Sequence, residues 1–177
     1  MEQIRYTKRI VNDTEKINAF LNRSRVGVVG MQAGEYPYAV PVNYVMMNGC
    51  AYFHGMGSGK KVDILDGSPK VCFTVFEEIG TVTDAMPCHV DTAYMSVMIM
   101  GTARRVADSS EAAAALQLLL DKFMPGFFGQ KMSGTLIEKY RSGMDANAVA
   151  VFKIETEYLT AKGNSAPPEA LHKPQRP

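Results

Sequence analysis

Residues 36–61 read YPYAVPVNYVMMNGCAYFHGMGSGKK and hold the strongest local structure signals in the chain. Residues 36–47 have the composition of a long strand that Pro37 and Pro41 interrupt. Proline cannot donate to a β-ladder, so we expect these positions at an edge, at a bulge, or where the backbone faces something other than a strand. Asn48-Gly49 is the pair most typical of a tight hairpin turn, so residues 50–54 should pair with this strand.

The second strand of the hairpin runs into a glycine-rich turn, residues 55–59, that delivers Lys60 and Lys61. Glycines let backbone N–H groups approach an anion, a helix starting near Ser58 would direct its positive end at it, and the lysines would add full charge. The pattern favours a site for a phosphate monoester, such as that of a phosphorylated cofactor. A plain glycine-rich turn with two solvated lysines accounts for an isolated GSGKK equally well.

Two nucleotide-binding motifs are excluded. In a P-loop, glycine would stand where this chain has His54, and a serine or threonine where it has Lys61, so no hydroxyl is placed to hold magnesium. No GxGxxG follows a strand, which argues against a Rossmann domain.

Composition predicts a single cytoplasmic domain. The 177 residues are 46% hydrophobic, enough for one substantial core, and the net charge of +1 asks for neither nucleic acid nor an anionic membrane. We find no apolar run long enough for a membrane span and no signal peptide. Three cysteines without CxxC spacing predict neither disulfides nor a zinc site, and the cluster Cys88-His89-Val-Asp91 has too few ligands for a closed one, so we expect no metal.

The rest of the chain alternates short strands with a few helices. We expect a helix over 13–22, capped by Asn12, and an irregular segment over 77–92. A proline-rich tail, 162–177, should be flexible beyond a single domain at 1–161. This order predicts a mainly β, six-stranded antiparallel barrel with flanking helices. The remaining expected strands are 26–31, 71–76, 94–106 and 148–154. The remaining helices are 111–123, interpreted as structural or at a dimer surface, and 135–140.

Five motifs in this order resemble the flavin-binding split-barrel superfamily of pyridoxamine 5'-phosphate oxidase-like proteins, and within it the nitroimidazole-resistance (Nim) group. The resemblance covers about residues 10–154 and implies a Greek-key split barrel, usually a homodimer with FMN between the subunits. The motifs are Pro37-Tyr-Ala-Val-Pro41-Val42-Asn43-Tyr44, Tyr52-Phe-His54-Gly55, Gly59-Lys60-Lys61, Val71-Cys-Phe73 and Tyr94-Met-Ser96-Val97.

The resemblance also implies residue roles. Lys60 and Lys61 would face the FMN phosphate, with Gly55, Ser58 and Gly59 in the same turn. The backbone of Pro41, Val42, Asn43 and Tyr44 would lie along the isoalloxazine edge, and Ser96 and Val97 would border the cofactor. The chain departs from the family where Met95 stands between Tyr94 and Ser96, because an arginine is common beside them.

His54 and Asn43 each have two interpretations. His54 could donate to phosphate or act as a catalytic acid near the flavin, or it could only order the turn. Asn43 could bond a flavin carbonyl or ring nitrogen, or satisfy the bend at Pro41.

Three functions remain. The first is an FMN-dependent oxidoreductase that reduces small nitro-aromatic or related acceptors with a reduced nicotinamide or another donor. The second is a non-catalytic flavin- or haem-binding barrel that acts as a carrier or sensor. The third, pyridoxamine-phosphate oxidation, ranks lowest because residues 151–177 lack an evident basic substrate motif.

Overall fold

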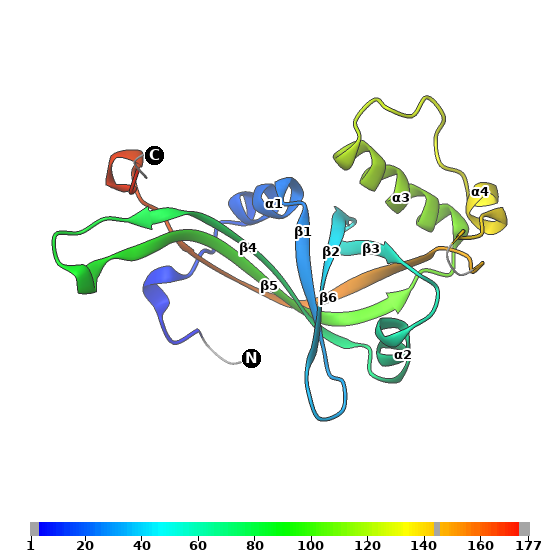
Figure 1. Ribbon diagram of the computed structural model, residues 1–177, viewed down its shortest axis with the longest axis horizontal. Helices are drawn as coiled ribbons and strands as arrows, with labels where there is room; N and C mark the ends of the chain where they lie inside the picture. Colours follow the sequence, from blue (N-terminus) through cyan, green and yellow to red (C-terminus); the bar gives the residue numbers. More distant parts are fainter. Residues whose placement is uncertain (1–3, 144–145, 174–177) are drawn as a thin grey trace.

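The computed structural model describes residues 4–143 and 146–173. Six antiparallel strands close into one barrel in the order β1-β2-β3-β6-β5-β4, with helices on its outside, which confirms the predicted fold class (Figure 1). The strands are β1 Val26–Met31, β2 Tyr38–Met47, β3 Cys50–Gly55, β4 Lys70–Val82, β5 Asp91–Arg105 and β6 Ala150–Asn164. The α-helices are α1 Thr14–Arg23, α2 Lys60–Gly67, α3 Ser109–Phe123 and α4 Gly134–Lys139, and the 3-10 helices are η1 Thr7–Arg9, η2 Pro87–His89 and η3 Pro168–Ala170.

The β2–β3 hairpin forms as its sequence predicts. Asn48 and Gly49 both have positive φ, 51° and 77°, which is the conformation that a tight Asn-Gly hairpin turn requires. Pairing then runs from Met47 opposite Cys50 to Tyr44 opposite Phe53. The next residues along the two strands are Asn43 and His54, so this register places them side by side.

One half of β2 has a single neighbour. Residues 38–43 pair with β1 along their whole length, whereas pairing with β3 begins only at Tyr44. Pro41 lies in this half, opposite Val28. The expectation that the prolines mark backbone facing something other than a strand is therefore confirmed for Pro41, and this stretch has a free edge.

Aromatic side chains fill the inside of the barrel next to that edge. The rings of Phe53 and Phe152 stack with centroids 5.3 Å apart, and Tyr44 meets Phe73 edge to face at 4.9 Å. The Tyr44 hydroxyl donates to the Leu21 carbonyl at 2.7 Å, which satisfies the one polar atom of this fully buried side chain. The interior beneath β2 is therefore closed, and ligands must approach from outside the barrel.

Two expectations about chain segments are wrong. Residues 77–92 are not irregular throughout, because β4 and β5 continue as a paired arm that reaches Val82 and Asp91 and projects from the barrel (Figure 1). The boundary at residue 161 is too early, because β6 continues to Asn164. Beyond it, Leu171 forms a bridge with Val82 and the His172 amide donates to Thr81 at 2.8 Å. Residues 174–177 of the expected flexible tail lie outside the described residues.

The helices begin close to the expected positions, with one change of cap. Asp13, not Asn12, caps α1, because its carboxylate accepts from the Lys16 amide at 3.0 Å. Asp108 caps α3 in the same way through the Glu111 amide. Within the described ranges, none of the helices combines the length and apolar character needed to cross a bilayer.

Candidate flavin site and apolar cavity

The glycine-rich turn brings two lysines to the free edge of β2. Gly59, with φ of 105°, precedes α2 and accepts the amides of Val62 and Asp63. The Lys60 Nζ atom lies 4.6 Å from the Tyr38 ring centroid, and the Lys61 Nζ atom lies 5.4 Å from that of Phe53. Neither lysine forms an ion pair with any described carboxylate.

The Lys61 ammonium lies in the space that the missing side chain at Gly55 leaves open. A Cβ atom at residue 55 would lie 2.5 Å from the Lys61 Nζ, so a larger residue there would displace the flexible end of this lysine. Partial burial lowers the pKa of Lys61, because the surrounding protein solvates its ammonium less well than water does. A half-buried cation without a carboxylate partner is a suitable place for an anionic ligand.

A third cation at the turn escapes sequence analysis. The Arg105 guanidinium, at the end of β5, donates to the Gly57 carbonyl at 3.3 Å. A Cβ atom at Gly57 would lie 3.0 Å from that guanidinium and 2.9 Å from the Ala148 carbonyl, so a larger residue here would clash with the main chain. Arg105 is 48 residues from Gly57. No local motif links them, because the pairing of β5, β6 and β3 creates the contact.

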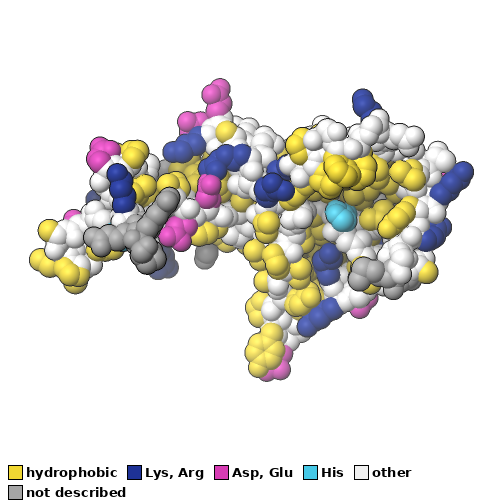
Figure 2. All heavy atoms as spheres, turned by 45° about the horizontal axis from the view of Figure 1, so that its top comes forward, with side chains coloured by type: hydrophobic (Ala, Val, Ile, Leu, Met, Phe, Trp, Pro, Cys, Tyr) yellow, Lys and Arg dark blue, Asp and Glu magenta, His cyan; other side chains and the backbone are white. Residues whose placement is uncertain are grey.

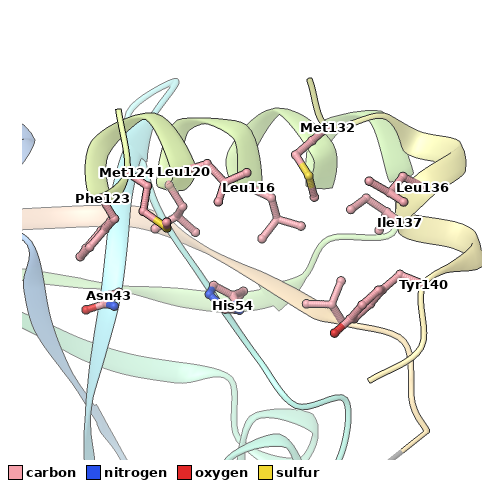
Figure 3. A pocket seen from close by; sticks show the side chains of 12 residues that line it. Asn43, His54, Leu116, Leu120, Phe123, Met124, Met132, Leu136, Ile137 and Tyr140 are labelled. Carbon is pink, nitrogen blue, oxygen red and sulfur yellow. The ribbon is translucent and has the colours of Figure 1, made fainter. Parts of the chain in front are cut away.

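His54 and Asn43 face an apolar cavity of about 420 Å³ outside the barrel (Figure 3). The cavity lies between the β2–β3 pair and the helices α3 and α4, and it opens on the face shown in Figure 2 as a hydrophobic hollow with one histidine in it. Besides these two polar residues, its lining is hydrophobic: Leu116, Leu119, Leu120, Phe123, Met124, Met132, Leu136, Ile137, Tyr140 and Val149.

The cavity adds a role to the helix at 111–123, which the sequence predicted to be structural or at a dimer surface. One part of α3 packs on Val45, Tyr52 and Val151 of the barrel, and its last two turns line the cavity. An alanine- and leucine-rich helix looks the same in sequence whether its apolar face meets a core or a ligand, so no sequence signal separates the two.

The His54 ring is the only titratable nitrogen in the cavity lining. Its pKa lies below the ordinary 6.5, first because the surrounding protein displaces water from the ring and second because Lys61 is close. The imidazole is therefore neutral at pH 7 and can donate from one nitrogen and accept at the other.

The other predicted site residues fall into two groups. Pro41 and Asn43 are exposed on the outer face of β2, whereas the side chains of Val42 and Tyr44 are buried, so only their backbone can meet a ligand. Ser58 lies in the turn, where its hydroxyl accepts from Asn147 at 3.3 Å.

Ser96 and Val97 lie elsewhere in the same chain. Ser96 pairs with Phe76 and Lys162, and the Val97 side chain is fully buried. Arg105, which touches the turn, is nine residues further along β5, which corresponds to about 30 Å of strand. Within one chain, the fold does not bring these two residues to the lysine turn.

Among the described residues, no group of three or more His, Cys, Asp or Glu side chains is arranged to hold a metal ion. Cys88 is exposed, and in the same segment the Nδ1 atom of His89 lies 3.5 Å from the Oδ1 atom of Asp84.

The fold and site define a barrel with a cationic, glycine-rich turn and an adjacent apolar cavity. A model of the pyridoxamine 5'-phosphate oxidase family matches residues 13–162. The chain therefore belongs to this family of flavin-binding split barrels. No curated protein matches the chain significantly.

Several solved structures share the fold. A flavocytochrome, Anf3, from Azotobacter vinelandii aligns with this chain at a TM-score of 0.75 and 23% identity. The alignment covers 94% of this chain and 74% of the flavocytochrome chain. A candidate 5-nitroimidazole antibiotic resistance protein from Bacteroides thetaiotaomicron aligns at a TM-score of 0.66 and 23% identity. This alignment covers 86% of this chain and 85% of the Bacteroides chain. A FAD- and haem-binding protein from Mycobacterium smegmatis aligns at a TM-score of 0.71 and 17% identity. This alignment covers 89% of this chain and 74% of the Mycobacterium chain. At these identities, the likeness establishes the architecture alone.

The electrostatic link between Lys61 and His54 can be tested by NMR. In Lys61→Gln, the pKa of His54 should rise toward 6.5 without reaching it, because the neighbouring charge is lost while the burial remains. A pH titration of the ring protons, assigned with His54→Gln, measures it. Lys60→Gln serves as the matched control, because Lys60 stacks on Tyr38. An equal rise in both variants, or none in Lys61→Gln, would contradict this assignment.

Proposed function

We propose that the protein is an FMN-dependent oxidoreductase. The observation that carries the proposal is the cationic turn, where Lys60, Lys61 and Arg105 lie at the glycine-rich residues 55–59 and none of the three pairs with a described carboxylate. A phosphate monoester would supply the missing negative charge and accept charge-assisted hydrogen bonds there. Lys61, as the more buried lysine, should contribute more than Lys60.

The free edge of β2 suits the rest of the cofactor. The backbone at residues 41–44 leads from the region of the turn toward the cavity, and Asn43 offers an amide that can bond a flavin carbonyl or ring nitrogen. When bound, FMN would supply the hydride or electron chemistry. The chain's own residues then bind its phosphate, orient its ring and hold a second, apolar reactant in the cavity.

The cavity favours a small apolar acceptor. Its walls exclude water, and neutral His54 can donate a proton or a hydrogen bond to a polar group on the reactant. A nitro-aromatic compound has this combination of an apolar ring and an acceptor group, and the architecture shared with the Bacteroides protein agrees with it. We propose a reduced nicotinamide as electron donor and the cytoplasm as the compartment.

We further propose a homodimer with FMN at the interface between subunits. The outer faces of β2, β1, β4, β5 and β6 align in two rows without a charged side chain: Pro41, Val28, Thr74, Met98 and Thr160, and Ala39, Gly30, Cys72, Met100 and Tyr158. No described helix covers this face. Its edge is the half of β2 that carries Pro41 and Asn43, so a second copy seated there would adjoin the flavin and could bring Ser96 to it.

Flavin binding to the purified protein tests the phosphate site. Lys61→Ala should weaken FMN binding about tenfold to a hundredfold, the value of lost charge-assisted hydrogen bonds, and leave riboflavin binding, which involves no phosphate, within about twofold. Titration monitored by flavin fluorescence gives both constants, and Lys131→Ala, an exposed lysine elsewhere, is the control. If FMN and riboflavin bind with the same affinity to the wild type, the turn is not the phosphate site.

Oligomeric state tests the proposed interface. Met98→Glu places a charge in the middle of the uncharged face and should raise the dimer dissociation constant at least about a hundredfold. The matched control is Leu118→Glu on α3, because Leu118 is 39% exposed and Met98 38%. Light scattering during size-exclusion chromatography measures the mass. A wild-type monomer, or a dimer that persists in Met98→Glu, would overturn this arrangement.

Haem binding is a second candidate function, supported by the position of His54. A single histidine in an apolar cavity matches the way in which proteins hold haem iron, and Met124 and Met132 offer thioether groups in the same lining. Of two proteins with the same architecture, one is named a FAD- and haem-binding protein and the other a flavocytochrome.

Titration with hemin separates this candidate from the first. If the cavity is a haem site, a Soret band typical of histidine ligation should appear at one equivalent of hemin, and His54→Ala should remove it while leaving FMN binding intact. His89→Ala, on the exposed arm, is the control. A spectrum that is the same in wild type and His54→Ala would exclude this function.

A further inference from the structure

Two cations stand at the Phe123 end of the apolar cavity. The guanidinium carbon of Arg25 lies 4.4 Å from the centroid of the Phe123 ring, whose side chain lines the cavity. The Lys122 Nζ atom donates to the carbonyls of Ser24 at 2.5 Å and Tyr44 at 3.1 Å, immediately next to Asn43. This end of the cavity is therefore positive, although the lining itself is apolar.

These two cations lack the carboxylates that other cations of this protein have. Arg23 pairs with Glu77, Arg104 with Glu155, and Lys153 with Glu111. In the described parts of the chain, no carboxylate pairs with Arg25 or Lys122. The pKa of Lys122 is lowered by burial and then by the charge of Arg25, so two like charges repel each other across a partly dry site.

Stabilisation of the C-terminus of α3 does not account for the pair. Lys122 lies in the last turn of that helix, but its hydrogen bonds go to carbonyls of Ser24 and Tyr44, outside α3. The Arg25 guanidinium lies over the Phe123 ring, and none of its N–H groups donates to a described acceptor, so they can bind a ligand. A bound acidic group would remove the repulsion and use those donors.

The pair is distinct from the lysine turn. Lys60 stacks on Tyr38 at one end of β2, and Lys122 lies 4.5 Å from the centroid of the Tyr44 ring near its middle. Tyr44 is six positions along the strand from Tyr38, about 20 Å, so one phosphate held by Lys60 cannot also reach Lys122. None of Lys60, Lys61 and Arg105 is among the cavity-lining residues, whereas Phe123 beneath Arg25 is.

We propose that the cavity binds an apolar ring compound that carries one acidic group, a carboxylate or sulfonate, held by Arg25 and Lys122. The rings of this compound would lie against Leu120 and Phe123 of α3, and the end of the compound away from the acidic group would point past His54. This inference names the class of reactant for the cavity and rests on the proposed function in treating the cavity as the reactant side of the flavin.

A matched pair of dyes tests the proposal. The anionic probe 8-anilinonaphthalene-1-sulfonate and the neutral probe N-phenyl-1-naphthylamine share one ring system and differ in the sulfonate. Fluorescence titration of the flavin-free and the FMN-loaded full chain gives their affinities. Arg25→Gln should weaken the anionic probe about tenfold, as expected for lost charge-assisted hydrogen bonds, and leave the neutral probe within about twofold.

Two further variants keep the result specific. Lys139→Gln removes an exposed charge next to Tyr140, at the other end of the cavity, and should change neither affinity. Leu120→Gln makes the lining polar and should weaken both probes. Equal losses of both probes in Arg25→Gln, equal losses of the anionic probe in Arg25→Gln and Lys139→Gln, or binding that survives Leu120→Gln would each overturn the proposal. Failure of FMN to bind at the lysine turn would leave these dye affinities unchanged.

Discussion

The free edge of β2 is the constraint on which the candidate site depends. Residues 38–43 pair with β1 alone, because β3 is too short to accompany them and turns away into the glycine-rich segment. Pro41 in this stretch has no N–H group, so it gives a competing strand one donor less. The same gap lets the lysine turn approach β2 from one side and α3 from the other. A longer β3 would have extended the sheet across the space where the cavity now opens.

The two partly buried lysines around this edge have the same electrostatic situation. Lys61 and Lys122 are both partly buried, and burial lowers the pKa of each. Partial desolvation of a cation without a carboxylate costs free energy, and Lys61 is placed here next to Gly55, where no Cβ competes for the space. An anionic ligand bound near each of the two lysines would offset this desolvation free energy.

The sequence predicts those parts of the fold and site that depend on local chemistry. Asn48-Gly49 specifies its turn through backbone conformation, and the glycines before Lys60 and Lys61 mark the cationic turn within ten residues. Arg105 and Arg25 could not be found this way, because strand pairing and the packing of α3 bring them to the site from distant positions. The arm of β4 and β5 was missed for a related reason: Gly80 and polar residues weaken its strand pattern, and pairing across the arm supplies what local propensity lacks.

The proposed assembly and the proposed reactant binding would use different parts of the outer face of the barrel. The cavity lies where α3 covers this face. The uncharged rows that begin at Pro41 and Ala39 lie further along β2 on the same outer face, and Asn43 lies between the rows and the cavity. A partner subunit on those rows would complete the surroundings of the flavin without entering the cavity. Loss of the dimer should therefore affect flavin affinity first, and the choice of reactant should remain a property of the single chain.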